Sequence, residues 1–106
     1  MGCRTARGFL LERRVEFEAR DLFKQPLDER ELAQVLAGLE PEEFLSRRSG
    51  AFTALGYGRR IPPRAQVVRD VARDPGLLRR PLMVGPRGER VVGFDRRRYE
   101  ELFPLR

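Results

Sequence analysis

The stretch DPGLLRRPLMV at residues 74–84 places two arginines directly before a proline that opens a short apolar run. A peptide bond before proline adopts the cis form at low cost, and a proline at the start of a strand fixes a corner in the backbone. A guanidinium held rigidly at that corner is suited to bind an oxyanion or a thiolate. The single cysteine, Cys3, lies far away near the N-terminus. We expect the chemistry of the protein where Cys3 meets this corner.

The composition limits the size of the protein and removes several classes of site. A chain of 106 residues is predicted to form one domain and to bury about 65% of the surface of its unfolded chain. It contains no histidine, which removes the commonest general base and metal ligand. One cysteine is too few for a structural zinc site or an internal disulfide. Any disulfide chemistry therefore involves a second molecule.

Arginine supplies nearly all of the positive charge. The formal net charge is +6, from 22 Lys and Arg against 16 Asp and Glu, and Lys24 is the only lysine. Such an excess is compatible with nucleic-acid affinity. The charges are nevertheless dispersed along the chain, and the aromatic residues follow core patterns. We interpret the arginines as the composition of a GC-rich genome and expect no direct binding to nucleic acid.

The sequence predicts neither a membrane span nor a signal peptide. No apolar run approaches the ~20 residues of a membrane span, and the N-terminus lacks the apolar core of a signal peptide. We expect a soluble cytoplasmic protein without a membrane partner.

Helical spacing is clearest over residues 28–39. Asp28 and Glu31 have the spacing of a capping box, and leucines and a valine recur at i, i+3, i+4 and i+7 from Leu32 to Leu39. Five further helices are predicted: over residues 3–13, from Pro41, after Ser49 with Phe52 and Leu55 inward and Gly56 as the stop, over residues 64–73 with Ala65, Val68 and Ala72, and after Asp95 with Tyr99, Leu102 and Phe103 on one face.

Strand patterns occur at three places. Residues 15–19 alternate strictly between apolar and charged side chains, which predicts a strand with one buried face. Residues 82–84 and 90–92 flank the turn sequence GPRG at 85–88, which predicts a hairpin. These patterns predict a sheet of three strands from which one member is missing.

Five sequence pieces carry a resemblance to a known family. They are CRTAR at 3–7, RDLFKQPL at 20–27, Arg48-Ser49 ahead of Phe52 and Leu55, PGLLRRP at 75–81 and VGFD at 92–95. In this order the chain resembles the arsenate reductase-like branch of the thioredoxin fold. That branch includes the glutaredoxin-dependent arsenate reductases and the Spx-type transcription regulators.

The resemblance implies an α/β fold with a thioredoxin-like, or glutaredoxin-like, mixed sheet. It also implies a single domain over residues 1–106 with a helical insert at about 40–75. Family members carry one more strand before the cysteine, so the chain is identified as a member that lacks the first strand. Either the start codon lies further upstream, which we favour, or the protein lacks a central strand.

The resemblance also assigns roles to residues. It implies that Cys3 is the nucleophile that attacks arsenate or a mixed disulfide, and that Arg80 holds the anion or thiolate. Arg48 is the matching arginine on the other side of the pocket. Pro81 is implied to be a cis proline facing the thiol. From the residues alone, Cys3 at the start of a helix favours the thiolate, as does Arg7.

Ordinary structural explanations stay open for each of these residues. The alternatives are that Cys3 is merely a small residue near a chain end, that Arg80 is a surface arginine, and that Pro81 is a plain strand-initiating proline. Two departures from the family pattern also bear on function. The second cysteine of the C-x-x-C motif is Ala6 here, and the further arginine that arsenate reductases carry in the last strand is Gly93.

Two functions follow from the resemblance. The first is a monothiol oxidoreductase similar to arsenate reductase, with a small oxyanion as substrate, no bound cofactor, and glutathione or glutaredoxin as reductant. The second is an Spx-type regulator that binds the RNA polymerase alpha subunit without catalysis. Whether the protein is an enzyme is left open at this point.

Overall fold

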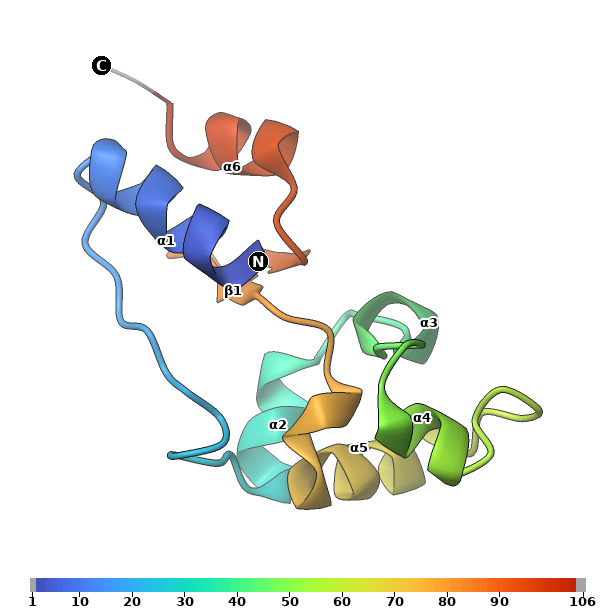
Figure 1. Ribbon diagram of the computed structural model, residues 1–106. Helices are drawn as coiled ribbons and strands as arrows, with labels where there is room; N and C mark the ends of the chain where they lie inside the picture. Colours follow the sequence, from blue (N-terminus) through green and yellow to red (C-terminus); the bar gives the residue numbers. More distant parts are fainter. Residues whose placement is uncertain (1, 105–106) are drawn as a thin grey trace. The chain divides into compact units, whose positions relative to one another are not determined.

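The computed structural model describes residues 2–104, which divide into two compact units (Figure 1). The split unit comprises residues 2–19 and 80–104, and the continuous unit comprises residues 20–79. The interpretation of the chain as one domain with a helical insert remains a prediction. Helices α3 (Pro41–Phe44), α4 (Gly50–Ala54) and α5 (Arg64–Arg73) fall within the range expected for that insert.

The split unit combines two helices with a hairpin. Helix α1 spans Gly2–Glu12 and helix α6 spans Arg96–Leu102. Strand β1 (Leu82–Val84) pairs antiparallel with β2 (Arg90–Val92), and Met83 lies opposite Val91. The backbone N–H of Gly85 donates to the Glu89 carbonyl at 2.8 Å and closes the turn. The predicted hairpin is therefore confirmed with the expected strand bounds.

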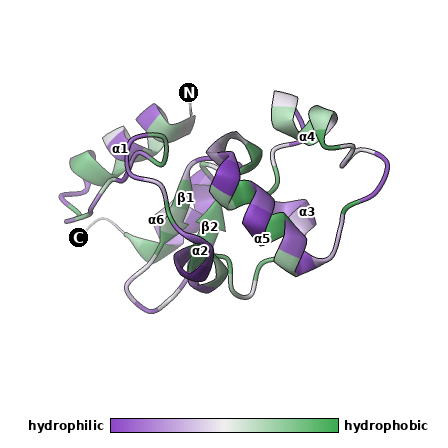
Figure 2. Cartoon of the chain, turned by 90° about the horizontal axis from the view of Figure 1, so that it is seen from below, coloured by the Kyte–Doolittle hydropathy of each residue, from purple (hydrophilic) through white to green (hydrophobic). Residues whose placement is uncertain are grey.

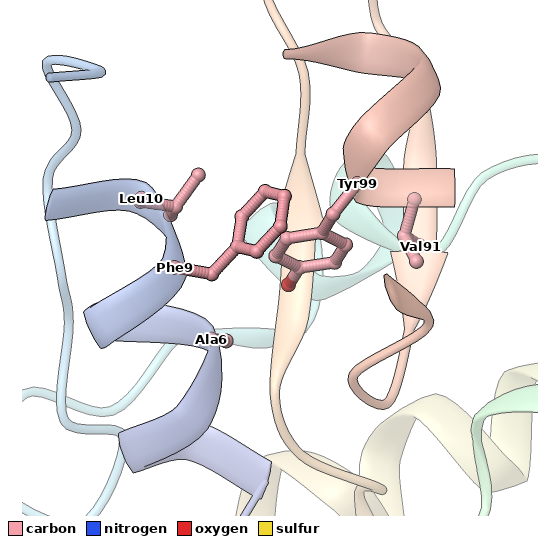
Figure 3. Packing of buried hydrophobic residues seen from close by; sticks show 5 residues of the cluster. All are labelled: Ala6, Phe9, Leu10, Val91 and Tyr99. Carbon is pink, nitrogen blue, oxygen red and sulfur yellow. The ribbon is translucent and has the colours of Figure 1, made fainter. Parts of the chain in front are cut away.

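Aromatic rings fill the core of this unit (Figure 3). Phe9 of α1 contacts both Phe94 and Tyr99, with ring centroids 5.7 Å apart in each pair; the Phe9–Tyr99 pair is drawn in Figure 3. The Phe94 and Tyr99 rings meet edge to face with their centroids 4.9 Å apart, which is a favoured geometry for aromatic pairs. Val91 of β2 is buried in the same cluster. The predicted apolar face of the last helix is confirmed, because Tyr99 is buried and Leu102 and Phe103 are partly buried against this cluster.

The strand predicted at residues 15–19 is wrong. This segment follows α1 without helical or strand pairing, and among its residues only Val15 is partly buried. Alternation describes which side chains share a face, whereas a strand also needs a neighbouring edge to pair its N–H and C=O groups. Within residues 2–104 the only sheet is the antiparallel pair β1–β2, so the expected three-stranded arrangement is not formed there.

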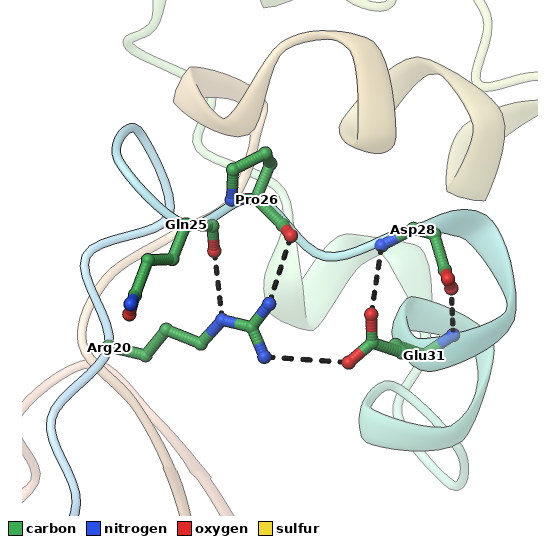
Figure 4. Close-up of polar contacts among 5 residues, drawn as sticks. All are labelled: Arg20, Gln25, Pro26, Asp28 and Glu31. Carbon is green, nitrogen blue, oxygen red and sulfur yellow. Dashed lines mark hydrogen bonds and ion pairs between the residues drawn. The ribbon is translucent and has the colours of Figure 1, made fainter.

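The continuous unit is helical. Helix α2 spans Glu29–Val35 and is followed by α3, α4, α5 and the short 3-10 helix η1 at Pro75–Leu77. The predicted capping box is confirmed: the Asp28 carboxylate accepts from the Glu31 N–H at 2.8 Å, and the Glu31 carboxylate accepts from the Asp28 N–H. Arg20 donates to the carbonyls of Gln25 and Pro26 and pairs with Glu31, which ties the segment before α2 to its first turn (Figure 4).

The end of α2 and the exposure of Leu55 both differ from the sequence-based expectation. Helix α2 stops at Val35 and not at Leu39, because the chain turns at Gly38 with a φ of 83°. Leu55 was expected inward but is 50% exposed. Gly56 turns the chain with a φ of 74°, and the buried Tyr57 ring packs 5.7 Å from Phe52 instead.

Helix α5 has the predicted bounds and buries the expected Val68, but its other buried residues differ from those expected. Polar and apolar side chains alternate around it (Figure 2). Val67, Val68 and Val71 are buried, whereas Ala65 is exposed. No helix within residues 2–104 has the length and apolar character needed to span a bilayer.

Candidate thiol site

Cys3 lies in the first turn of α1. Its thiol is free and exposed to solvent, and the first N–H groups of a helix lack intrahelical acceptors. Arg7 follows four positions later, so it shares a face of the helix with Cys3 and is likewise exposed. This part of α1 therefore presents a thiol and a guanidinium to solvent.

Arg80 and Pro81 lead into β1. The Arg80–Pro81 peptide bond is cis, Arg80 is exposed and Pro81 is half-buried. In Figures 1 and 3 the N-terminal end of α1 lies beside the segment that enters β1. The split unit therefore contains four of the predicted site residues, namely Cys3, Arg7, Arg80 and Pro81.

Arg48 belongs to the continuous unit. It lies in the turn between α3 and α4, directly before Ser49, whose hydroxyl accepts from the Phe52 N–H at 3.1 Å and caps α4. The Arg48 side chain is exposed. Its role beside the thiol stays a prediction, as do the roles of Cys3, Arg7, Arg80 and Pro81.

Gly93 occupies the place of the further arginine. It is buried directly after β2, and its N–H donates to the Pro81 carbonyl at 2.7 Å. Its φ of 72° lies in the left-handed region, where a residue with a Cβ is strained. The backbone that holds Pro81 in place is therefore one that disfavours an arginine at residue 93.

Ala6 occupies the place of the second cysteine. It is 5% exposed and packs in the cluster with Phe9 and Tyr99. The helix position three residues after Cys3 is therefore buried among apolar side chains. Within residues 2–104 no three His, Cys, Asp or Glu side chains are grouped so as to hold a metal ion.

Tyr99 is a member of this site that the sequence interpretation treated as core only. Burial raises its pKa above the ordinary 10.0, and the charge of Cys3 raises it further. The phenol of α6 and the thiol of α1 are therefore electrostatic neighbours. The only sequence signal for this pairing is a tyrosine in place of phenylalanine on the apolar face of α6.

Comparisons with known proteins match most of the chain. A model of the ArsC family matches residues 2–102. The global transcriptional regulator Spx of Enterococcus faecalis is 35% identical over 104 residues, which is 96% of this chain and 78% of that protein.

Two solved structures have a similar fold. An ArsC family related protein from Bacteroides fragilis superposes with a TM-score of 0.83 at 23% identity, covering 96% of this chain and 88% of that one. An arsenate reductase (ArsC) related protein from Brucella melitensis gives a TM-score of 0.70 at 26% identity, covering 97% and 86%. These matches confirm the thioredoxin-like fold that the resemblance to the arsenate reductase-like branch implies.

Proposed function

The chain belongs to the ArsC family, and within that family we propose that it is a transcription regulator of the Spx type, which acts by binding RNA polymerase and not by turning over arsenate. The observation that carries the proposal is the 35% identity with the Spx regulator of Enterococcus faecalis across 96% of the chain. The alpha subunit of the polymerase is the partner expected of this type.

The geometry around Pro81 supports this choice over arsenate reduction. An arsenate reductase of the kind the sequence resembles uses a third arginine, and the matching Gly93 is buried with a φ of 72°. Any side chain there strains the backbone whose N–H donates to Pro81. The anion site is therefore short of one guanidinium, and the missing charge weakens stabilisation of a multiply charged oxyanion.

Ala6 further separates this chain from a regulator with a disulfide switch. With Ala6 buried in the core and Cys3 the only cysteine, an internal disulfide cannot form. Partner binding is therefore expected to be insensitive to internal disulfide formation. Control by redox state would act only through an adduct between Cys3 and another molecule.

The exposed thiol favours a second candidate, a monothiol oxidoreductase. Cys3 lies free in the first turn of α1, where it can attack an oxyanion or a mixed disulfide. Arg80 and Arg7, which lie in the same unit as Cys3, would bind the anion in that reaction. Since no second cysteine is present, glutathione or glutaredoxin would supply the electrons that resolve the intermediate.

Two measurements on the same preparations separate the candidates. Calorimetric titration with the purified polymerase alpha subunit is expected to show binding that Cys3→Ser leaves unchanged. A glutathione- and glutaredoxin-coupled assay with arsenate is expected to show no turnover. In the arsenate assay Arg80→Ala tests the predicted anion-binding arginine. Arg97→Ala is its matched control, because it removes an arginine whose side chain is 92% exposed on α6.

The opposite pattern would contradict the regulator. Turnover that Cys3→Ser and Arg80→Ala abolish but Arg97→Ala preserves, together with no binding to the alpha subunit, would establish the oxidoreductase instead.

A further inference from the structure

Tyr99 is buried as a ring but not used as a hydrogen-bonding group. The residue is 1% exposed and sits among Phe9, Phe94 and Ala6. Such a position would be filled equally well by phenylalanine if only packing mattered. The hydroxyl is therefore the part of Tyr99 that packing does not explain.

The Tyr99 hydroxyl has no hydrogen-bond partner among residues 2–104. Yet no fully enclosed side-chain oxygen in that part of the chain is left without a partner. The two observations together require that the hydroxyl oxygen reaches an opening in the surface of the split unit. A buried aromatic residue thus presents only its polar tip.

That tip is directed at α1, the helix that carries the thiol. In Figure 3 the phenol oxygen points toward the helix on the side of Ala6. Cys3 precedes Ala6 by three positions, so the two residues are neighbours along α1, with Cys3 exposed and Ala6 buried. The charge of Cys3 also raises the pKa of Tyr99, which agrees with this proximity.

We propose that Tyr99 is a positioning residue for Cys3, and that its hydroxyl donates a hydrogen bond to the sulfur while the thiol reacts with a small disulfide. The inference rests on the thiol reactivity of the second candidate function and does not depend on polymerase binding. An O–H donor aimed at a thiolate favours the anionic form that attacks.

The reaction used to test this is thiol–disulfide exchange with 4,4′-dithiodipyridine, a neutral disulfide. The Cys3 thiolate forms a bond to one sulfur of the probe, and the S–S bond of the probe breaks. The departing sulfur takes the electron pair, and the pyridinethiolate gains a proton from water to give the coloured thione. One mixed disulfide and one thione form for each Cys3 consumed.

Tyr99→Phe keeps the ring and removes only the hydroxyl. We expect it to slow the reaction of Cys3 with the probe by about threefold at neutral pH, since one hydrogen bond to a charged group is lost and part of the effect is offset by higher nucleophilicity. Circular dichroism and the thermal midpoint establish that the variant is folded. Arg97→Ala is the matched surface control and is expected to react at the parent rate.

A second readout tests the pairing from the side of the phenol. In a Tyr57→Phe background Tyr99 is the only tyrosine, so the ultraviolet absorbance of tyrosinate reports its ionisation alone. Capping Cys3 with iodoacetamide leaves it uncharged and is expected to lower the pKa of Tyr99, because the Cys3 charge no longer opposes ionisation.

A structural role alone would not produce this shift. An unchanged rate in Tyr99→Phe, together with a tyrosinate titration that capping does not move, would overturn the proposal. Failure of the oxidoreductase candidate would appear as absent turnover in the arsenate assay. Failure of the present inference would appear in the reaction of Cys3 with the disulfide probe.

Discussion

The split unit packs on aromatic rings, whereas the otherwise apolar core of the continuous unit also encloses a charged residue, Asp70. In the split unit Phe9, Phe94 and Tyr99 meet with centroids 4.9 to 5.7 Å apart. In the continuous unit the buried Asp70 accepts from the Tyr57 hydroxyl at 2.5 Å. A buried carboxylate requires hydrogen-bond donors, because burial without them costs free energy. Both units therefore depend on apolar packing, and the continuous unit depends in addition on the hydrogen bonds to Asp70.

The chain order of these contacts differs as well. Phe9 meets partners about ninety positions later, since the split unit closes only when residues 80–104 return to α1. Tyr57 and Asp70 are 13 positions apart. Arg64 reaches back to the carbonyls of Leu36 and Leu39, with both distances at 2.6 Å. The continuous unit therefore depends on contacts of shorter range.

Truncating one ring in each unit should have the largest effect. Phe44 is fully buried in the continuous unit and Phe9 is 5% exposed in the split unit. We expect Phe44→Ala and Phe9→Ala each to lower the free energy of unfolding by about 3–5 kcal/mol, because each leaves a cavity. Urea unfolding measures both values. A loss below about 1 kcal/mol in either variant would show that its site collapses to fill the space.

Removing the buried carboxylate should cost less. Asp70→Ala leaves the Tyr57 hydroxyl and the Gln66 amide, which donates to Asp70 at 2.8 Å, without their acceptor. We expect a loss of about 2–3 kcal/mol in urea unfolding, since hydrogen bonds to a charged group are lost. Gln66→Ala is the matched control, because it removes one donor and leaves the Tyr57 bond in place. Equal losses in the two variants would contradict the importance assigned to the tyrosine bond.

Alkaline pH should weaken the same contact. Burial raises the pKa of Tyr57 above its ordinary 10.0, and the hydrogen bond to Asp70 and the charge of that carboxylate raise it further. Below pH 10 the folded and unfolded chains both keep this proton, so its contribution is constant. Above pH 10 the unfolded chain loses it first, and the free energy of unfolding should fall by about 1.4 kcal/mol per pH unit.

Tyr57→Phe tests this origin. Its unfolding free energy should depend less on pH in the alkaline range than that of the parent chain. Tyr99, whose pKa is also raised, still contributes part of the slope in this variant. An unchanged slope would assign the alkaline effect to other groups.

Helix caps offer a matched comparison of smaller size. The Asp28 carboxylate accepts from the Glu31 N–H at 2.8 Å in the continuous unit, and the Asp95 carboxylate accepts from the Arg98 N–H at 3.2 Å in the split unit. We expect Asp28→Ala and Asp95→Ala each to cost about 1 kcal/mol, with the larger loss for the shorter bond. Thermal unfolding followed by circular dichroism gives both values. The reverse order would show that bond length does not rank these caps.

The smallest effect is expected at a cation over a ring. The Arg13 guanidinium lies 4.2 Å from the centroid of Phe9 in the split unit. We expect Arg13→Ala to lower the free energy of unfolding by about 0.5–1 kcal/mol. Arg97→Ala, which removes an arginine whose side chain is 92% exposed, serves as the control in the same urea titrations. Identical values for the two variants would remove the ring contact as a source of stability.

The candidate site was only partly predictable. Cys3, Arg80 and Pro81 could be singled out from short sequence pieces, because a lone thiol at a helix start and an arginine before a strand-initiating proline are visible in the residues themselves. Tyr99 could not, since a tyrosine on an apolar face has the pattern of a core residue. Its relation to Cys3 depends on how α6 packs against α1.

The hydrogen bonds that cap a helix start join residues only three positions apart. The sequence alone therefore determined where α2, α4 and α6 begin. Asp28, Ser49 and Asp95 each accept from an N–H three positions later. The same short range explains the correct bounds of α5 and of the hairpin. A strand partner for residues 15–19, the burial of Tyr57 in place of Leu55, and the bond from Gly93 to Pro81 each require a second segment of chain. Only tertiary packing decides which segment that is, because it alone brings residues distant in sequence within reach of a contact.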